Sequence, residues 1–304
     1  MKHPLNRRDF MQDTTSLLGL GALAMTPLPS LASSLIAPRN IKKAVKIGMV
    51  QGDLSLQAKF QLLMDLGFDG IELDSPNDLD VEEVIAARDA TNIDIHGVVC
   101  STHWQYPLSH ADESVRAKCV AGMTTALHDA KAYGSTSVLL VPAVVNKTIS
   151  YAQAWDLSIQ EIHKLVPLAE ELDIQIAFEN VWNQFLLSPL EAARYVDEFD
   201  SKHVGWYFDV GNVINYGWPE QWIEILGDRI FKLDIKEYSR TKRNDEGLWK
   251  GFGVDLLKGD CDWPSVMAAL DKIGYSGWAT AEIRGGDEAR LREIAQRMDT
   301  IFAS

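Results

Sequence analysis

Three acidic residues, Glu179, Asp209 and Glu282, each follow an apolar run, and a fourth, Asp234, lies within another such run. An ionised carboxylate at a buried position is costly unless a cation or hydrogen-bond donors compensate its charge. For a single acid, backbone amides or a lysine are the simpler compensation. The acids together favour a divalent metal with oxygen ligands, such as Mn²⁺, Mg²⁺ or Co²⁺.

The segments that carry these acids alternate between short apolar runs and longer helical patterns. We expect strands at residues 45–50, 68–73, 93–99, 137–141, 174–179, 204–209, 230–235 and 278–283. We expect helices at residues 55–66, 81–90, 114–133, 151–172, 189–199, 219–226, 263–273 and 288–301. Continuous apolar strands indicate a parallel sheet that is buried on both faces.

Eight strand–helix units predict a single-domain (β/α)₈ barrel over residues 42–304. A doubly wound sheet is the alternative, but it usually has a glycine-rich turn after its first strand, where this chain has Gln51-Gly52-Asp53. In a barrel, the carboxyl ends of the strands surround the active site. The four acids are therefore expected to meet at one mouth.

The net charge and the cysteine content bear on nucleic-acid binding and on disulfide formation. The net charge of −14 disfavours nucleic acid, whose phosphates would be repelled. The three cysteines do not form a disulfide pattern, although two of them could still pair. A homo-oligomer is compatible with the sequence.

Residues 1–34 are typical of an export signal. A basic start that contains Arg7 and Arg8, an apolar run at 16–25 and a small-residue cleavage site ending at Ala32 occur in the required order. The paired arginines resemble the twin-arginine motif. The sequence thus predicts a periplasmic or exported protein without membrane attachment after cleavage; a chance arginine pair in a tail is the alternative.

Several motifs in the same order resemble a known family. They are Phe-Glu-Asn at 178–180, Phe-Asp-Val-Gly-Asn at 208–212, Ala-Glu-Ile at 281–283 and the segment 253–263. Together they resemble the xylose-isomerase-like barrel family, and within it the L-ribulose-5-phosphate, L-xylulose-5-phosphate and ketose 3-epimerases. The resemblance implies that Glu179, Asp209 and Glu282 bind a metal, with Mn²⁺ as the expected ion.

The same resemblance implies a histidine as the fourth ligand, in a His-x-Lys-Asp motif. This chain has Asp234-Ile235-Lys236-Glu237 instead. We expect Asp234 to be a fourth ligand or a near neighbour of the metal. An additional anionic ligand would hold a hard cation more firmly and weaken it as a Lewis acid.

Further residues are expected to contact the sugar. They are Glu72, His103, Trp104, Trp182, Asn212 and Lys236. A histidine followed by an indole suits hydroxyl binding and ring stacking, although packing within the loop is an equal alternative for His103. The long connection at residues 239–261 is expected to be a lid or substrate-binding loop rather than a solvated insertion.

The resemblance implies proton transfer at a carbon next to a carbonyl, through an enediolate, with Glu179 and Glu282 as acid and base. Since sugar phosphates are cytoplasmic, an exported enzyme would act on an unphosphorylated sugar, keto-sugar or glycoside. We expect a sugar isomerase or epimerase. A lyase or hydrolase of 3-keto-glycosides and a non-catalytic sugar-binding barrel are the alternatives, whereas a DNA-repair endonuclease would need a histidine-rich metal cluster.

Overall fold

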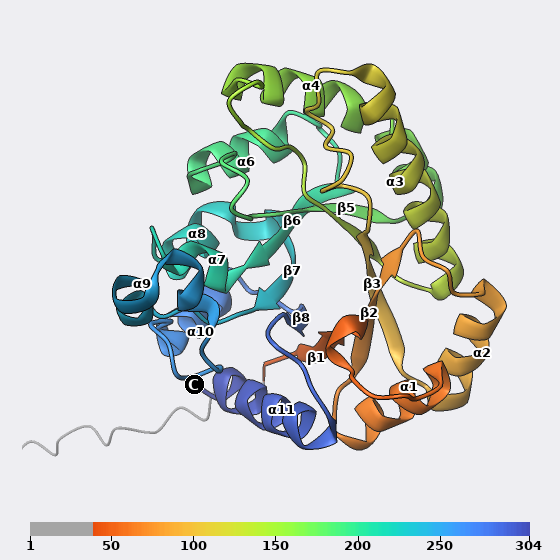
Figure 1. The fold of residues 1–304 in the computed structure, drawn as a ribbon, viewed down its shortest axis with the longest axis vertical. Helices are drawn as coiled ribbons and strands as arrows, with labels where there is room; N and C mark the ends of the chain where they lie inside the picture. The colour runs from red at the N-terminus through yellow and green to blue at the C-terminus, as the bar shows by residue number, and fades with distance from the viewer. Residues whose placement is uncertain (1–38) are drawn as a thin grey trace, which may run out of the picture. The chain divides into compact units, whose positions relative to one another are not determined.

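The computed structural model describes residues 39–304, which form a closed barrel of eight parallel strands (Figure 1). The strands are β1 (Ile41–Lys46), β2 (Gly70–Ser75), β3 (Asp94–Cys100), β4 (Ser137–Leu140), β5 (Gln175–Glu179), β6 (Val204–Asp209), β7 (Ile230–Ile235) and β8 (Gly277–Ala281). Each strand pairs with the next in the sequence, and β8 pairs with β1. The predicted (β/α)₈ barrel is confirmed.

Helices surround the ring of strands in Figure 1. They are α1 (Leu56–Asp65), α2 (Val81–Thr91), α3 (Glu113–Tyr133), α4 (Tyr151–His163), α5 (Val166–Leu172), α6 (Pro189–Asp197), α7 (Val210–Ile214), α8 (Pro219–Leu226), α9 (Arg240–Glu246), α10 (Trp263–Lys272) and α11 (Glu288–Phe302). Ser55 caps α1 through its side chain, and Gly134 ends α3 with a left-handed φ of 78°. Within residues 39–304, no helix is long and apolar enough to cross a membrane.

The structure corrects two predicted elements. The first strand ends at Lys46 instead of continuing to Val50, because residues 47–49 form a 3₁₀ turn. The predicted helix at 151–172 is two helices, since Pro167 lies in the first turn of α5 and lacks the amide that would continue α4. The first correction matters for the site because it places a lysine at the carboxyl end of β1.

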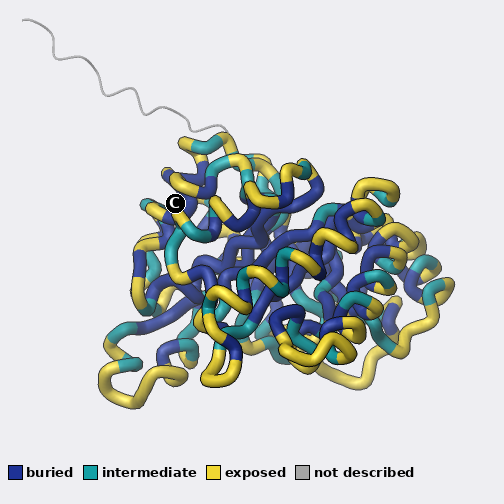
Figure 2. Tube along the Cα trace, turned by 90° about the horizontal axis from the view of Figure 1, so that it is seen from above, coloured by how far each residue is buried: buried dark blue, intermediate teal, exposed yellow. Residues whose placement is uncertain are grey.

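Buried residues lie in the interior of the molecule, and exposed residues lie at its periphery (Figure 2). The large apolar core combines residues of the strands and the surrounding helices, and a small separate cluster contains Leu139, Ala177 and Tyr207. Alternation along the strands points Ala177 and Tyr207 to the same side as Glu179 and Asp209, which is the inside of the barrel. The apolar filling of the barrel therefore lies directly below the acids.

A buried polar group accompanies this inner cluster. The Tyr207 hydroxyl lies 2.7 Å from Thr280 Oγ1, which lies 3.1 Å from His96 Nε2. The imidazole also stacks on Trp278, with ring centroids 4.5 Å apart, and Lys232 Nζ donates to the His96 carbonyl. His96 is thus a core histidine whose ring nitrogens have polar neighbours. The three cysteines are free.

Candidate active site

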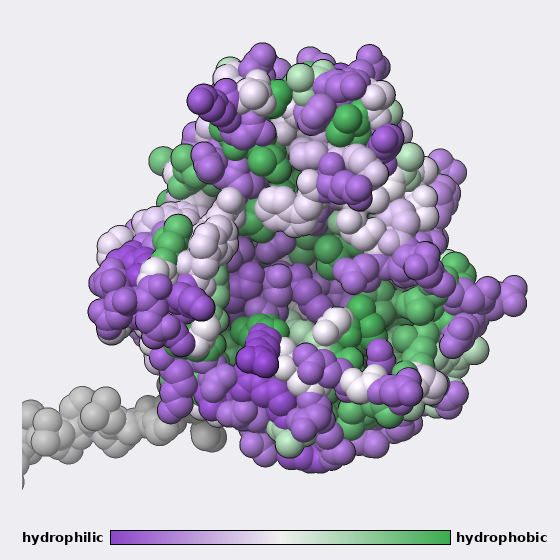
Figure 3. Space-filling view, viewed as in Figure 1, coloured by the Kyte–Doolittle hydropathy of each residue, from purple (hydrophilic) through white to green (hydrophobic). Residues whose placement is uncertain are grey.

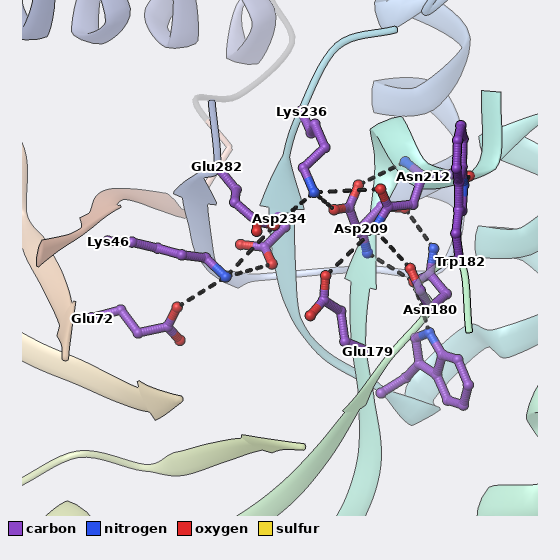
Figure 4. A network of polar contacts seen from close by, with 11 residues as sticks. Lys46, Glu72, Glu179, Asn180, Trp182, Asp209, Asn212, Asp234, Lys236 and Glu282 are labelled. Carbon is purple, nitrogen blue, oxygen red and sulfur yellow. Dashed lines mark hydrogen bonds and ion pairs between the residues drawn. The ribbon is translucent and has the colours of Figure 1, made fainter. Parts of the chain in front are cut away.

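Four carboxylates meet at the carboxyl ends of consecutive strands. Glu179 ends β5, Asp209 ends β6, Asp234 lies in β7, and Glu282 directly follows β8. One oxygen from each lies within 4.8 Å of the others, and all but Glu282 are buried (Figure 4). The predicted convergence of these acids is thus observed in the structure.

Local hydrogen bonds explain why two of the strands end at this point. The Asn180 amide accepts from the Asp209 backbone N–H at 2.9 Å and donates to the Asp209 carbonyl at 2.7 Å, which ties the end of β5 to the end of β6. The Asp209 side chain then accepts from the Asn212 N–H at 2.8 Å and caps the short helix α7. This capping bond uses one carboxylate oxygen and leaves the other for the site.

Two lysines lie among the acids (Figure 4). Lys236 Nζ is 2.7 Å from Asp209 Oδ2 and 2.9 Å from Glu282 Oε2. Lys46, at the end of β1, donates to Asp234 Oδ2 at 3.1 Å and lies 3.6 Å from both Glu282 and Glu72. Each ammonium group therefore bridges acids from different strands.

The residues present fit a divalent metal. The four clustered carboxylates face two ammonium groups, those of Lys46 and Lys236. Asp234 Oδ1 is buried without a hydrogen-bond partner. Hard oxygen donors with an excess of negative charge suit a cation such as Mn²⁺ or Mg²⁺. The clustered acids, Glu179, Asp209, Asp234 and Glu282, are the residues that would hold it.

Burial and the neighbouring charges separate the proton affinities of the two glutamates. Burial, together with repulsion from Glu282, raises the pKa of Glu179 to about 8. Burial acts in the same direction on Glu282, but Lys46 and Lys236 outweigh it and lower the pKa of that carboxyl to about 2. A pair of acids whose pKa values are driven apart is suited to acid–base chemistry.

The two aspartates show the same excess of negative charge. Burial raises the pKa of Asp209 to about 6, and it raises the pKa of Asp234 well above its usual range. A bound cation favours the ionised carboxylates and reverses these shifts.

A pocket of about 480 Å³ opens at the acids. It is lined by Trp104, Glu179, Val181, Trp182, Asn212, Lys236, Trp249, Phe252, Glu282, Ile283 and Arg284. In the view of Figure 3, hydrophilic residues gather at the centre of this face of the barrel. Of the residues predicted to bind sugar, Trp104, Trp182, Asn212 and Lys236 line this pocket.

The structure separates two predicted residues from the pocket. His103 is buried, its Nδ1 accepts from the Val141 N–H at 3.2 Å, and its ring packs edge-on against Trp104. These contacts correspond to the packing alternative. Glu72 is also buried, below Lys46, and it does not line the pocket. Neither residue lines the pocket, and a substrate contact of either stays a prediction.

The connection after β7 folds over one side of the pocket. It contains α9 and a 3₁₀ segment, Leu248–Phe252, and it contributes Trp249 and Phe252 to the lining. Both rings lie 4.8 Å from the Trp182 ring, measured between centroids. We call Trp182, Trp249 and Phe252 the aromatic wall. The segment therefore lines the pocket, and its role as a lid or substrate-binding loop stays a prediction.

Glu237 anchors this connection from below. Its buried carboxylate accepts from Trp263 Nε1 at 2.9 Å, from the Leu257 N–H at 3.0 Å and from the Cys261 N–H at 3.1 Å. All three donors lie at the far end of the connection. One carboxylate therefore closes the segment between β7 and α10 into a compact loop.

Replacing Glu237 with glutamine should loosen this loop, because an amide cannot accept from donors on both of its terminal atoms and leaves a buried N–H unpaired. We expect trypsin to cut at the lysines and arginines between residues 240 and 258 about tenfold faster. Mass spectrometry of the fragments measures the rates. Glu246→Gln, an exposed change in α9, is the control, and equal cleavage of the two variants would contradict the anchoring role.

Comparisons with known proteins show which family has this architecture. A model of the xylose isomerase-like TIM barrel family matches residues 60–301. An uncharacterised protein of Methanocaldococcus jannaschii is 25% identical over 190 residues, 60% of this chain and 63% of that protein. The inosose dehydratase of Geobacillus thermodenitrificans is 26% identical over 155 residues, 46% of this chain and 51% of that enzyme. The chain thus spans about half to two thirds of the length of these relatives.

Solved structures share the fold. A D-tagatose 3-epimerase-like protein superposes with a TM-score of 0.72 at 21% identity, covering 86% of this chain and 98% of that one. The 3-keto-D-glucoside 4-epimerase of E. coli superposes with a TM-score of 0.70 at 17% identity, covering 87% and 100%. These likenesses concern the fold, whereas the family match extends over most of the sequence. The chain therefore belongs to the xylose isomerase-like TIM barrel family.

Proposed function

We propose that this protein is a metal-dependent isomerase or epimerase that transfers a proton at a sugar carbon next to a carbonyl group. The observation that carries the proposal is the pair Glu179 and Glu282. They line one pocket and stand at the carboxyl ends of β5 and β8, which are three strands apart in the ring. Fold likeness to ketose 3-epimerases supports the same class of reaction.

The residues of the site have different roles in the proposed reaction. When bound by the four acids, a divalent metal supplies a Lewis acid that polarises the carbonyl. Glu282, which is kept ionised by its lysine neighbours, accepts the proton from one face of the sugar. Glu179, on the other side of the pocket, returns a proton to the opposite face and inverts the carbon. Lys236 and Asn212 line the pocket and bind the hydroxyl groups.

A screen in deuterated water tests the proposal. The purified chain is first analysed for bound metal, and it is then incubated with Mn²⁺ and a panel of free ketoses and 3-keto-sugars. We expect deuterium to enter at the carbon next to the carbonyl, as measured by NMR. A protein that binds sugars without exchange in the presence of metal would instead be a non-catalytic sugar-binding barrel.

A second candidate is elimination from a 3-keto-glycoside, which begins with the same proton abstraction. The pocket favours it, because the aromatic wall extends beyond the acids and leaves room for a leaving group. The similarity to inosose dehydratase is compatible with an elimination. Release of the aglycone in the same incubation distinguishes this reaction from epimerisation.

We also propose that the protein is exported and that its sugar is unphosphorylated. The predicted signal at 1–34 lies outside the described residues, so this part rests on the sequence alone. Turnover of phosphorylated pentuloses only would contradict the proposed sugar.

The export signal has its own test. Replacing Arg7 and Arg8 together with lysine should keep the unprocessed chain in the cytoplasm, since the twin-arginine route needs the arginine pair. Cell fractionation and mass spectrometry of the N-terminus measure location and processing, with Lys42→Arg as the control. If the wild-type protein is found in the cytoplasm and still begins at Met1, residues 1–34 are not an export signal.

A further inference from the structure

Two tryptophans line the pocket from opposite sides of the barrel. Trp104 follows β3, and Trp249 belongs to the loop after β7. Since β3 and β7 are four strands apart in a closed ring of eight, their loops lie across the mouth from each other. The pocket is therefore bounded by an aromatic surface on each side, with the acids at its base.

Both of these indoles are unusually open to solvent. Trp104 is 53% exposed and Trp249 is 67% exposed. Exposed aromatic side chains that gather around a pocket mark a surface for a ligand, because a lone domain gains nothing from leaving them in water. The two rings belong to the same pocket, and this distinguishes them from a scattered exposed residue such as Leu190 on α6.

The wall on the loop side is built to present carbon rather than polar atoms. Trp182 Nε1 donates to the Asn212 carbonyl at 2.8 Å, so its only hydrogen-bond donor is already used. Phe252 packs against Trp182 and against Tyr238, with centroids 4.8 Å apart in each case. This rigid support fixes an apolar surface beside Trp249.

The polar and the aromatic parts of the pocket suit two different halves of one ligand. Glu179, Glu282, Lys236 and Asn212 supply hydrogen-bonding groups at the base, where a sugar ring would react. The aromatic surfaces supply almost none. A volume of about 480 Å³ also lies in the range that holds drug-sized ligands and exceeds the needs of one sugar ring.

We propose that the aromatic part of the pocket is a subsite for a planar, apolar aglycone, and that the natural substrate is an aryl glycoside in its keto form rather than a free sugar. The proposal rests on the proposed function for the sugar half only. In the bound state, the aryl group lies between Trp104 and Trp249 and stacks on the aromatic wall. The glycosidic oxygen then faces the acids.

Titration calorimetry on the full metal-loaded chain tests the subsite without any reaction. The probes are 4-nitrophenyl glucoside, methyl glucoside and cellobiose, and both anomers are used for the first two. We expect the nitrophenyl glycoside to bind at least about tenfold more tightly than the methyl glycoside. Trp249→Ala should reduce this ratio to about twofold or less while leaving methyl glucoside binding unchanged.

Leu248→Ala is the matched control, because this neighbouring side chain is exposed on the same 3₁₀ segment and does not line the pocket. Equal affinities for aryl and methyl glycosides overturn the proposal. So does tighter binding of cellobiose, which would assign the slot to a second sugar, or dissociation of an oligomer by Trp249→Ala, which would assign it to a subunit contact.

Failure of the subsite and failure of the reaction are distinguishable. An aryl preference without deuterium exchange in any keto-sugar supports the subsite and removes the proposed function. Deuterium exchange in free keto-sugars without an aryl preference overturns the subsite and leaves the proposed function in place.

Discussion

Glutamine in place of Glu179 should abolish inversion of the sugar carbon and lower turnover by ~10²–10⁴-fold, the range for loss of a positioned acid or base. Glu282→Gln should do the same. The two variants should differ in deuterium exchange, because each keeps one carboxylate. Each single variant should exchange the proton of only one of the two epimers, namely the epimer whose proton faces the remaining glutamate. The double variant should exchange the proton of neither epimer. NMR in deuterated water, starting from each epimer separately, measures this pattern.

The control for both substitutions is Glu171→Gln, an exposed change on α5. Because both glutamates are also proposed ligands, metal content is measured on every variant. Inversion at the wild-type rate by Glu179→Gln would contradict the two-glutamate mechanism. Loss of exchange from both epimers in each metal-loaded single variant would show that the two carboxylates act as one unit.

The second large effect concerns stability. In the metal-free protein, the pKa of Glu179 is raised to about 8 and that of Asp209 to about 6, above their values in an unfolded chain. Between the unfolded and folded values the folded state holds more protons. The contribution of these two groups to the free energy of unfolding therefore falls as pH rises, by ~1.4 kcal/mol per pH unit for each such proton. This stabilisation is complete below the unfolded pKa values and is lost by about pH 8.

Urea unfolding between about pH 5 and about pH 8, with a chelator or with excess Mn²⁺, measures the effect. Metal should remove the decline, because it binds the ionised carboxylates and displaces their protons. Metal at about a thousand times its dissociation constant should add ~4 kcal/mol. Glu179→Gln should flatten the profile without metal. Equal pH profiles of the metal-free wild-type protein and of metal-free Glu179→Gln would contradict the raised pKa of Glu179.

The barrel and the clustered acids could be predicted from the sequence, and the reasons are physical. An alternation of apolar runs and helical patterns leaves few folds, and an acid at the end of a buried strand is conspicuous because its burial needs an explanation. Glu179 and Asp209 were found in this way. The role of His103 could not be assigned, because the sequence does not show whether a loop histidine turns toward a ligand or toward the backbone.

Lys46 was missed because the first strand was placed four residues too late along the chain. With the strand at 45–50, a lysine at position 46 lies at the entrance of the barrel. In the structure, β1 ends there and the ammonium reaches the acids. A signal in the sequence was the group of lysines at 42, 43 and 46, which interrupts the apolar pattern. Glu237 was missed because its partners lie some twenty residues downstream in the chain.

The contact between Lys46 and Asp234 joins β1 to β7, and it has a consequence for how sequences in this family change over time. A neutral imidazole and an aspartate paired with an ammonium carry the same net charge. An ancestor with histidine at position 234 could therefore exchange it for aspartate at little electrostatic cost only if a lysine stood at position 46. We expect the two positions to covary among relatives: aspartate should accompany lysine, and histidine should accompany an uncharged residue.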